Sequence, residues 1–231
     1  MDNFVKTGAD NKTHMFFWLV IPVLLIIGVI GIELTFSGAN LRMMYTEGGI
    51  VEILQFLFIG LAVLWAAKRF FDVQGRFLKA WVFLLMVGSF YIAGEEVSWG
   101  QWFFYWDTPD FWMGINDQSE TNLHNTSSWL DQKPRLLLFA GMIVGGLIIP
   151  AMRRWKPSRL PTRFAAIYPE NHMVIPALGV LVPYLVQEIA EHFFDIRLFE
   201  RVSEVQELYM YYFILLYIVD LRKLKKAQDS V

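Results

Sequence analysis

Residues 16–35 read FFWLVIPVLLIIGVIGIELT, a run in which Glu33 is the only charged side chain. A helix needs about 20 mostly apolar residues to cross the hydrocarbon core of a bilayer. The run is longer than the apolar core of a signal peptide (roughly 7–15 residues), and no small-residue cleavage motif follows it. We therefore predict a membrane-spanning helix at this position.

Five further apolar runs follow the first one. With residues 16–35, the predicted spans are residues 49–67, 78–100, 136–152, 172–194 and 203–219. The composition agrees, because 55% of the 231 residues are hydrophobic and only 18% are charged, against about 25% charged in an average soluble domain. The fold class predicted is an all-α, polytopic membrane protein with six transmembrane helices. The connections are too short for a separate soluble domain, so we expect residues 1–231 to form a single integral membrane domain.

Charge and cysteine content exclude several classes of function. The formal net charge is −2, which offers no basic surface for nucleic acid. The chain contains no cysteine, which excludes disulfides, thiol catalysis and thiolate metal ligands.

The basic residues predict an orientation. Fifteen of the 20 Lys and Arg residues fall at the termini and in the even-numbered connections, and the side richer in Lys and Arg is cytoplasmic. Both termini are therefore expected in the cytoplasm. Arg42, Lys133, Arg135, Arg197 and Arg201 are the five basic residues on the other, outer side.

The acidic residues show the opposite bias, since 16 of the 22 fall at the outer side. Several lie inside apolar helices, where an ionisable group costs at least about 2.5–3.5 kcal/mol at mid-depth. Bound cations, protonation or the few outer arginines must neutralise them. For Glu33, at the outer end of its helix, Arg42 is the expected partner.

Three predicted helices carry acids in patterns that suggest a site. The adjacent Glu95 and Glu96 point to different faces of the third span, and Ser98 follows on the face of Glu95; we predict these three as catalytic residues. Helical spacing of three, four and seven residues places acids and an imidazole on one face of the fifth span and acids with Tyr211 on one face of the sixth. The predicted metal ligands are Glu95, Glu96, Glu120, His124, Glu188, Glu191, His192, Glu204 and Glu207.

The connection between the third and fourth spans, residues 101–134, is rich in Trp, Tyr and Phe. Trp and Tyr favour the membrane interface, so we predict an aromatic-rich cap that lies over the outer helix ends. If its middle is helical, Glu120 and His124 share a face, and Glu188 and His192 repeat that spacing.

Carboxylates and imidazoles together would suit a divalent metal ion whose identity the sequence leaves open. The spacing differs from the Glu-x-x-His of di-iron bundles and from the His-Glu-x-x-His of zinc proteases. His14 and His172 fall on the cytoplasmic side and are interpreted as interface residues.

Three strings carry a resemblance to a known family. They are GEEVSWGQ at residues 94–101, NLHN at residues 122–125 and GIVEILQ at residues 49–55. They resemble a family of multi-pass bacterial membrane proteins that has no assigned function. The resemblance implies one integral unit in the bacterial cytoplasmic (inner) membrane, and it implies no activity.

The sequence thus predicts a metal-dependent membrane hydrolase or transferase that acts on a lipid or lipid-linked substrate at the outer leaflet. A non-catalytic membrane subunit or assembly factor is one alternative. A cation or proton transporter is another; against it, the acids avoid the middle of the spans, and no internal repeat of the kind common in transporters is found.

Overall fold

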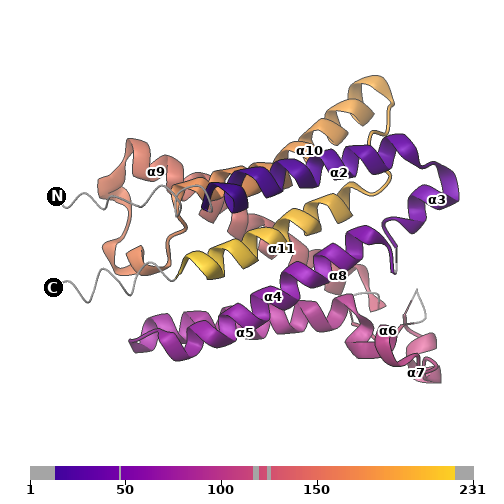
Figure 1. Ribbon diagram of the computed structural model, residues 1–231, viewed down its shortest axis with the longest axis horizontal. Helices are drawn as coiled ribbons and strands as arrows, with labels where there is room; N and C mark the ends of the chain where they lie inside the picture. The colour runs from indigo at the N-terminus through magenta and orange to yellow at the C-terminus, as the bar shows by residue number, and fades with distance from the viewer. Residues whose placement is uncertain (1–13, 47, 117–119, 124–125, 222–231) are drawn as a thin grey trace.

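The computed structural model describes residues 14–46, 48–116, 120–123 and 126–221, with the side chains of residues 128, 130 and 131 left out. All regular elements among them are helices (Figure 1). The all-α class is confirmed in this part of the chain. Five helices are long and apolar enough to cross a membrane: Phe16–Thr35, Ile50–Asp72, Arg76–Glu96, Gln132–Trp155 and Asn171–Phe194.

These five helices match five predicted spans to within a few residues at most ends. The first consists of η1 (Phe16–Val20) and α2 (Ile21–Thr35), and the next two are α4 (Ile50–Asp72) and α5 (Arg76–Glu96). The last consists of η7 (Asn171–Met173) and α10 (Val174–Phe194). Many large apolar side chains on these helices are exposed, which is rare on the surface of a soluble monomer. The structure therefore indicates a membrane protein.

The fourth predicted span begins earlier than the sequence suggested. We expected it to start at residue 136, after Pro134, but α8 begins at Ser128 and runs through the proline to Met142. It continues without a break into η4 (Ile143–Ile148) and α9 (Ile149–Trp155). A proline removes one backbone hydrogen bond but does not always end a helix. The extra turns make Arg135 a helical residue rather than a loop residue.

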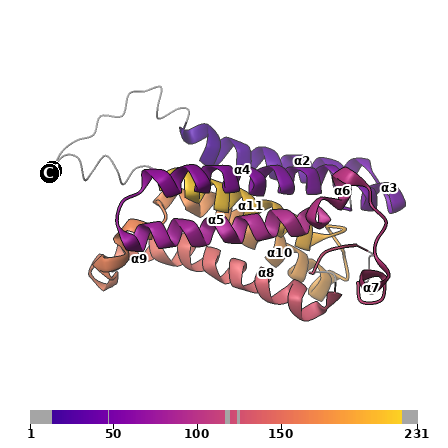
Figure 2. The same cartoon turned by 90° about the horizontal axis from the view of Figure 1, so that it is seen from below.

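The sixth predicted span forms α11, Val202–Asp220, which lies in the middle of the bundle (Figures 1 and 2). It packs along both α4 and α10, and α5 packs along α4. Buried residues are consecutive from Leu208 to Phe213, which is more than one turn of 3.6 residues. Every face of this part of α11 is therefore covered by protein.

Tyrosine hydroxyls on α11 fasten it to its neighbours. Tyr209 donates a hydrogen bond of 2.5 Å to the carbonyl of Pro22 in α2, and Tyr212 donates to the carbonyl of Phe17 in η1. Tyr217 donates to the carbonyl of Ile167 in η6 (Thr162–Ile167) and accepts from the indole of Trp81 in α5. Each buried hydroxyl thereby keeps a partner, as buried polar groups require.

The bundle has two ends, which we name by their short helices. The α7 end holds α3 (Gly38–Met43), α6 (Gln101–Phe104) and α7 (Asp110–Met113), and the α9 end holds α9 with η5 (Pro157–Arg159) and η6. At the α7 end, the Glu33 carboxylate accepts hydrogen bonds from the Tyr45 hydroxyl (2.7 Å) and the backbone N–H of Glu200 (3.0 Å). The expected partner Arg42 instead binds Glu200, at 2.9 Å.

The aromatic segment after α5 gathers at one side of the α7 end. In Figure 1, α6 and α7 lie below α4, whereas the end of α10 lies at the opposite side of the bundle. Most of its aromatic side chains are exposed, namely Phe103, Phe104, Tyr105, Trp106, Phe111 and Trp129.

Candidate functional site

The last turn of α5 presents its two adjacent glutamates to different parts of the molecule, as their positions on a helix predict. Glu96 reaches α11, where its carboxylate accepts a hydrogen bond of 2.7 Å from the Tyr211 hydroxyl. Glu95 reaches the aromatic segment, where its carboxylate accepts 2.7 Å bonds from the Trp99 indole and from the backbone N–H of Leu123. The end of α5 therefore belongs to two polar groups of residues.

The first group surrounds Tyr211, and we name it the acid cluster: Glu96, Glu204, Glu207 and Tyr211. Glu204, Glu207 and Tyr211 lie on one face of α11 by helical spacing, as predicted. The Tyr211 hydroxyl bonds to Glu96 of α5, and Glu204 and Glu207 share its face of α11. Three predicted site residues from two helices thus belong to the neighbourhood of one phenol.

Neighbouring helices partly balance the charge of the acid cluster. Arg135 of α8 contacts Glu207 with its Nε atom 2.5 Å from Oε1, and Arg201 lies 3.9 Å from Glu204. The Glu204 and Glu207 side chains are only 14% and 12% exposed. These two guanidinium groups stabilise the ionised forms of the carboxylates that they contact.

Gln55 of α4 closes the acid cluster from another side. It is fully buried, and its Nε2 donates to the backbone carbonyl of Glu204 at 2.9 Å and to its carboxylate at 3.3 Å. Its Oε1 has no hydrogen-bond partner among the described residues. A buried acceptor without a donor is costly, so this atom marks a place where a bound group, a water or an ion would be stabilised.

The second group holds Glu95, and we name it the cap network: Glu95, Ser98, Asn116, Glu120 and Asn122. Asn122 donates from Nδ2 to the Ser98 hydroxyl at 3.1 Å and also contacts the Glu120 carboxylate. Asn116 donates to the Asn122 side chain at 2.8 Å and accepts from the backbone N–H of Glu120 at 3.1 Å. All five residues are buried.

A left-handed turn carries Ser98 into the cap network. Ser98 and Trp99 have φ values of 47° and 55°, and Gly100 follows at 106°. Residues other than glycine adopt this conformation at a cost of about 1–2 kcal/mol each, and such strain often lies near functional sites. The indole bond to Glu95 and the amide bond from Asn122 hold the turn. The described partner of the Ser98 hydroxyl is an amide donor rather than a base.

The structure does not bring the predicted acids of α10 to either group. Glu188, Glu191 and His192 are exposed, and Glu191 contacts Gln187 of its own helix at 2.5 Å. The physical reason is the packing order, because α4 and α11 separate much of α10 from α5. The expected convergence of Glu188 and His192 with Glu95 and Glu96 is therefore not found. His124 lies outside the described residues, so its predicted pairing with Glu120 stays a prediction.

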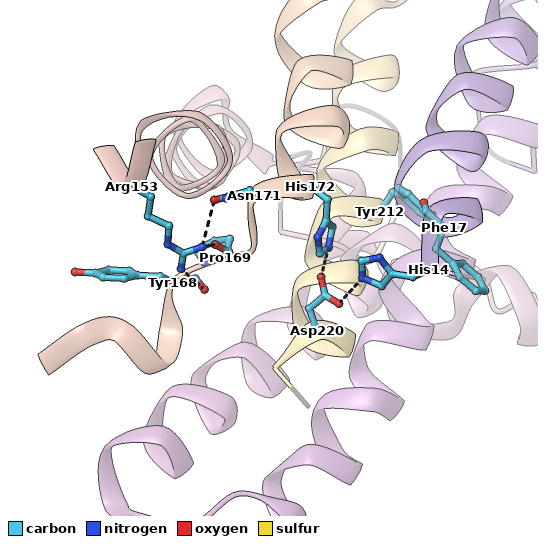
Figure 3. A network of polar contacts seen from close by, with 9 residues as sticks. All are labelled: His14, Phe17, Arg153, Tyr168, Pro169, Asn171, His172, Tyr212 and Asp220. Atoms are coloured by element: carbon cyan, nitrogen blue, oxygen red, sulfur yellow. Dashed lines mark hydrogen bonds and ion pairs between the residues drawn. The ribbon is translucent and has the colours of Figure 1, made fainter. Parts of the chain in front are cut away.

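Several residues of interest were not recognised in the sequence. The sequence identifies Arg135 as one of the few outer arginines that could neutralise the acids, but it does not predict its contact with Glu207. His14 and His172 were interpreted as interface residues, yet both contact Asp220 at the α9 end (Figure 3). His14, His172 and Asp220 all lie at the predicted cytoplasmic ends of their helices, and this shared depth could have identified them as neighbours.

No family model, curated protein or solved structure matches the chain.

Proposed function

We propose that the chain crosses the cytoplasmic membrane of a bacterium six times, with α11 as the sixth span. At 1.5 Å per residue, its 19 residues are about as long as the hydrocarbon core is thick. Its acids face protein rather than lipid, so α11 does not need to be as apolar as its neighbours. His14 before the first span and Asp220 at the end of α11 are 3.6 Å apart, which fits an even number of passes. The distribution of Lys and Arg then puts the α9 end and both termini in the cytoplasm.

In this membrane we propose a hydrolase or transferase that acts on a lipid or lipid-linked substrate from the outer leaflet, with the acid cluster as its reacting centre. The observation that carries the proposal is the buried Oε1 of Gln55, which has no hydrogen-bond partner among the described residues, in a side chain whose Nε2 contacts the Glu204 carboxylate. Apolar surroundings strengthen electrostatic effects on a reacting group.

We propose a divalent metal ion as the cofactor of this centre. The carboxylates of Glu96, Glu204 and Glu207 and the amide oxygen of Gln55 offer oxygen ligands of the kind that suits Mg²⁺, Mn²⁺ or Ca²⁺. Ligand atoms of the three acids do not all lie within 4.8 Å of one another, so these side chains would have to move closer together to bind the ion. A bound ion would polarise a phosphoryl or acyl oxygen of the substrate. The Tyr211 hydroxyl, held by Glu96, would donate a hydrogen bond to charge that develops on the substrate, and Arg135 would orient Glu207.

Turnover in proteoliposomes tests this proposal. The full chain is reconstituted in vesicles of phosphatidylethanolamine, phosphatidylglycerol and cardiolipin that contain a polyprenyl diphosphate, with and without EDTA. Mass spectrometry then follows every lipid species. We expect the unmodified protein to consume one species and EDTA to stop the reaction. Glu96→Gln and Glu207→Gln should each lower the rate about 10²–10⁴-fold, the usual contribution of a positioned acid or base.

Glu188→Gln is the matched control, because Glu188 is an exposed glutamate of α10 outside the acid cluster. It should keep the full rate. Ser98→Ala tests whether the cap network takes part in the chemistry. If Ser98 is the nucleophile, this variant should fold but be inactive. If the acid cluster alone reacts, the variant should keep its activity. The proposal fails if the unmodified protein changes no lipid, or if Glu188→Gln is as inactive as Glu96→Gln.

A transporter is the second candidate, because α11 carries acids at one end and Asp220 at the other, with buried tyrosine hydroxyls between them. Those of Tyr209, Tyr212 and Tyr217 each donate to a backbone carbonyl, so they do not form a continuous relay. Proton or cation flux in the same proteoliposomes, without lipid turnover, would favour transport. If neither activity is found and another protein co-purifies with the chain in mild detergent, the result would favour a non-catalytic subunit.

A further inference from the structure

Three residues from distant parts of the chain meet at the α9 end of the bundle. His14 lies just before η1, His172 lies in η7, and Asp220 ends α11. His172 contacts one carboxylate oxygen of Asp220, and His14 Nε2 lies 3.6 Å from the other (Figure 3). One ligand atom from each residue lies within 4.8 Å of the others. The three side chains are 23%, 15% and 12% exposed, so this group is largely shielded.

The backbone around His172 is held by a separate set of contacts. Arg153 of α9 donates to the carbonyl of Pro169 at 2.8 Å and to the carbonyl of Tyr168 and the side chain of Asn171 at 3.4 Å. Figure 3 shows these bonds on the turn that leads into His172. The Trp18 ring lies 6.0 Å from the His172 ring. His172 is thus positioned before any ligand arrives.

Two imidazoles share one carboxylate in this group. The ring centroids of His14 and His172 are 4.4 Å apart, and two protonated rings at this distance would repel each other. Neutral rings could each donate an N–H to the carboxylate in the matching tautomer, so a hydrogen-bonded group without metal is the alternative that the experiment must distinguish. A divalent transition metal ion would instead take one atom of each residue as a ligand, and these atoms lie within 4.8 Å of one another.

We propose that His14, His172 and Asp220 form a binding site for a divalent transition metal ion of the zinc class. Two imidazoles and one carboxylate are a common ligand set for Zn²⁺, Fe²⁺ and related ions. The ion fastens the beginning of the first helix to η7 and to the end of α11. Three protein ligands leave a further position for water. This site lies at the end of the bundle opposite to the acid cluster, and it does not depend on the proposed enzyme activity.

Zinc binding to the full chain tests the proposal directly. Protein purified in detergent without a histidine tag is treated with EDTA, dialysed and titrated with ZnCl₂, and bound zinc is measured by elemental mass spectrometry. We expect one tightly bound Zn²⁺ per chain and a higher unfolding temperature when zinc is present. His14→Ala, His172→Ala and Asp220→Asn should each weaken zinc binding at least tenfold.

His192→Ala is the control, because His192 is an exposed histidine at the other end of α10; it should bind zinc like the unmodified chain. His14→Ala changes a residue outside the core and so guards against a folding defect. Visible absorption of bound Co²⁺ should report the imidazole ligands and change in that variant. The proposal would be overturned if His14→Ala and Asp220→Asn bound zinc as tightly as the unmodified chain does. It would also be overturned if the unmodified chain bound zinc as weakly as these variants do.

Discussion

The Tyr211 hydroxyl of α11 donates a 2.7 Å hydrogen bond to the Glu96 carboxylate at the end of α5. This bond joins two helices that are both in contact with α4, and it places a phenol among three acids. We expect it to stabilise the fold as well as to shape the acid cluster.

Tyr211→Phe removes the donor and leaves the Glu96 carboxylate in place. A charged, half-buried group such as the Glu96 carboxylate that loses its hydrogen-bond donor lowers the free energy of unfolding by about 1–3 kcal/mol. The unfolding temperature should therefore fall. In a double-mutant cycle with Glu96→Gln, the two changes should show a coupling energy of about 0.5–3 kcal/mol. Tyr184→Phe, at an exposed tyrosine of α10, should leave the unfolding temperature unchanged. Strict additivity of Tyr211→Phe and Glu96→Gln would argue against the contact.

Arg135→Gln should destabilise the protein because Glu207 loses its nearby cation. The pair is partly shielded, at 31% and 12% exposure, so we expect a loss of about 1–2 kcal/mol, between surface and buried pairs. Adding Glu207→Gln should restore most of the stability, since no uncompensated charge remains. The double variant should nevertheless stay inactive in the lipid assay. Thermal unfolding and turnover, measured on the same samples, separate the structural from the chemical role of Glu207.

Gly179 of α10 tests the packing of the central helix. A Cβ atom at this position would collide with the ring of Tyr209 on α11, and overpacking of this kind costs about 1–3 kcal/mol. Gly179→Ala should therefore lower the unfolding temperature by several degrees. Gly141→Ala on α8 meets open space and should be neutral or slightly stabilising. Equal effects of the two variants would mean that α10 does not pack on α11 as described.

Tyr45, between α3 and α4, predicts a change of stability at alkaline pH. Burial, together with the neighbouring Glu33 carboxylate, raises the pKa of Tyr45 above its ordinary value. The unfolded chain then loses this proton at a lower pH than the folded chain. The stabilisation is complete below about pH 10, the ordinary pKa of tyrosine, and is lost as the pH rises further.

Tyr45→Phe removes this titration. Thermal unfolding measured from about pH 8 to about pH 11 should fall less steeply in the variant than in the unmodified protein. At neutral pH the variant should be less stable by about 1 kcal/mol, because it lacks the hydrogen bond to Glu33. Parallel curves across this pH range would contradict the assignment.

The helices could be predicted from the sequence because the apolar runs are long, and several of them end near charged residues, as α4 does near Lys68 and Arg69. The start of α8 could not be predicted because the polar residues 131–133 and Pro134 precede the apolar run, although the helix continues through this proline. The position of Glu204, Glu207 and Tyr211 on one face also followed from spacing alone.

The arrangement of helices around α11 could not be predicted. Apolar helices of similar length give no signal for which faces meet, so the contacts of Glu96 with Tyr211 and of Arg135 with Glu207 were beyond sequence reasoning. The same uncertainty allowed Glu188 and His192 to be grouped with Glu95. A shared position at one membrane face was visible for His14, His172 and Asp220, but their contact depends on which helix ends are neighbours.

A density map of the protein in lipid nanodiscs, prepared with MgCl₂ and the lipid mixture of the turnover assay, tests the acid cluster most directly. We expect non-protein density between the carboxylates of Glu96 and Glu207 that also reaches the Gln55 amide oxygen. A well-resolved map in which only Tyr211, Arg135 and Gln55 contact these carboxylates would show a structural polar contact between helices and no reacting centre.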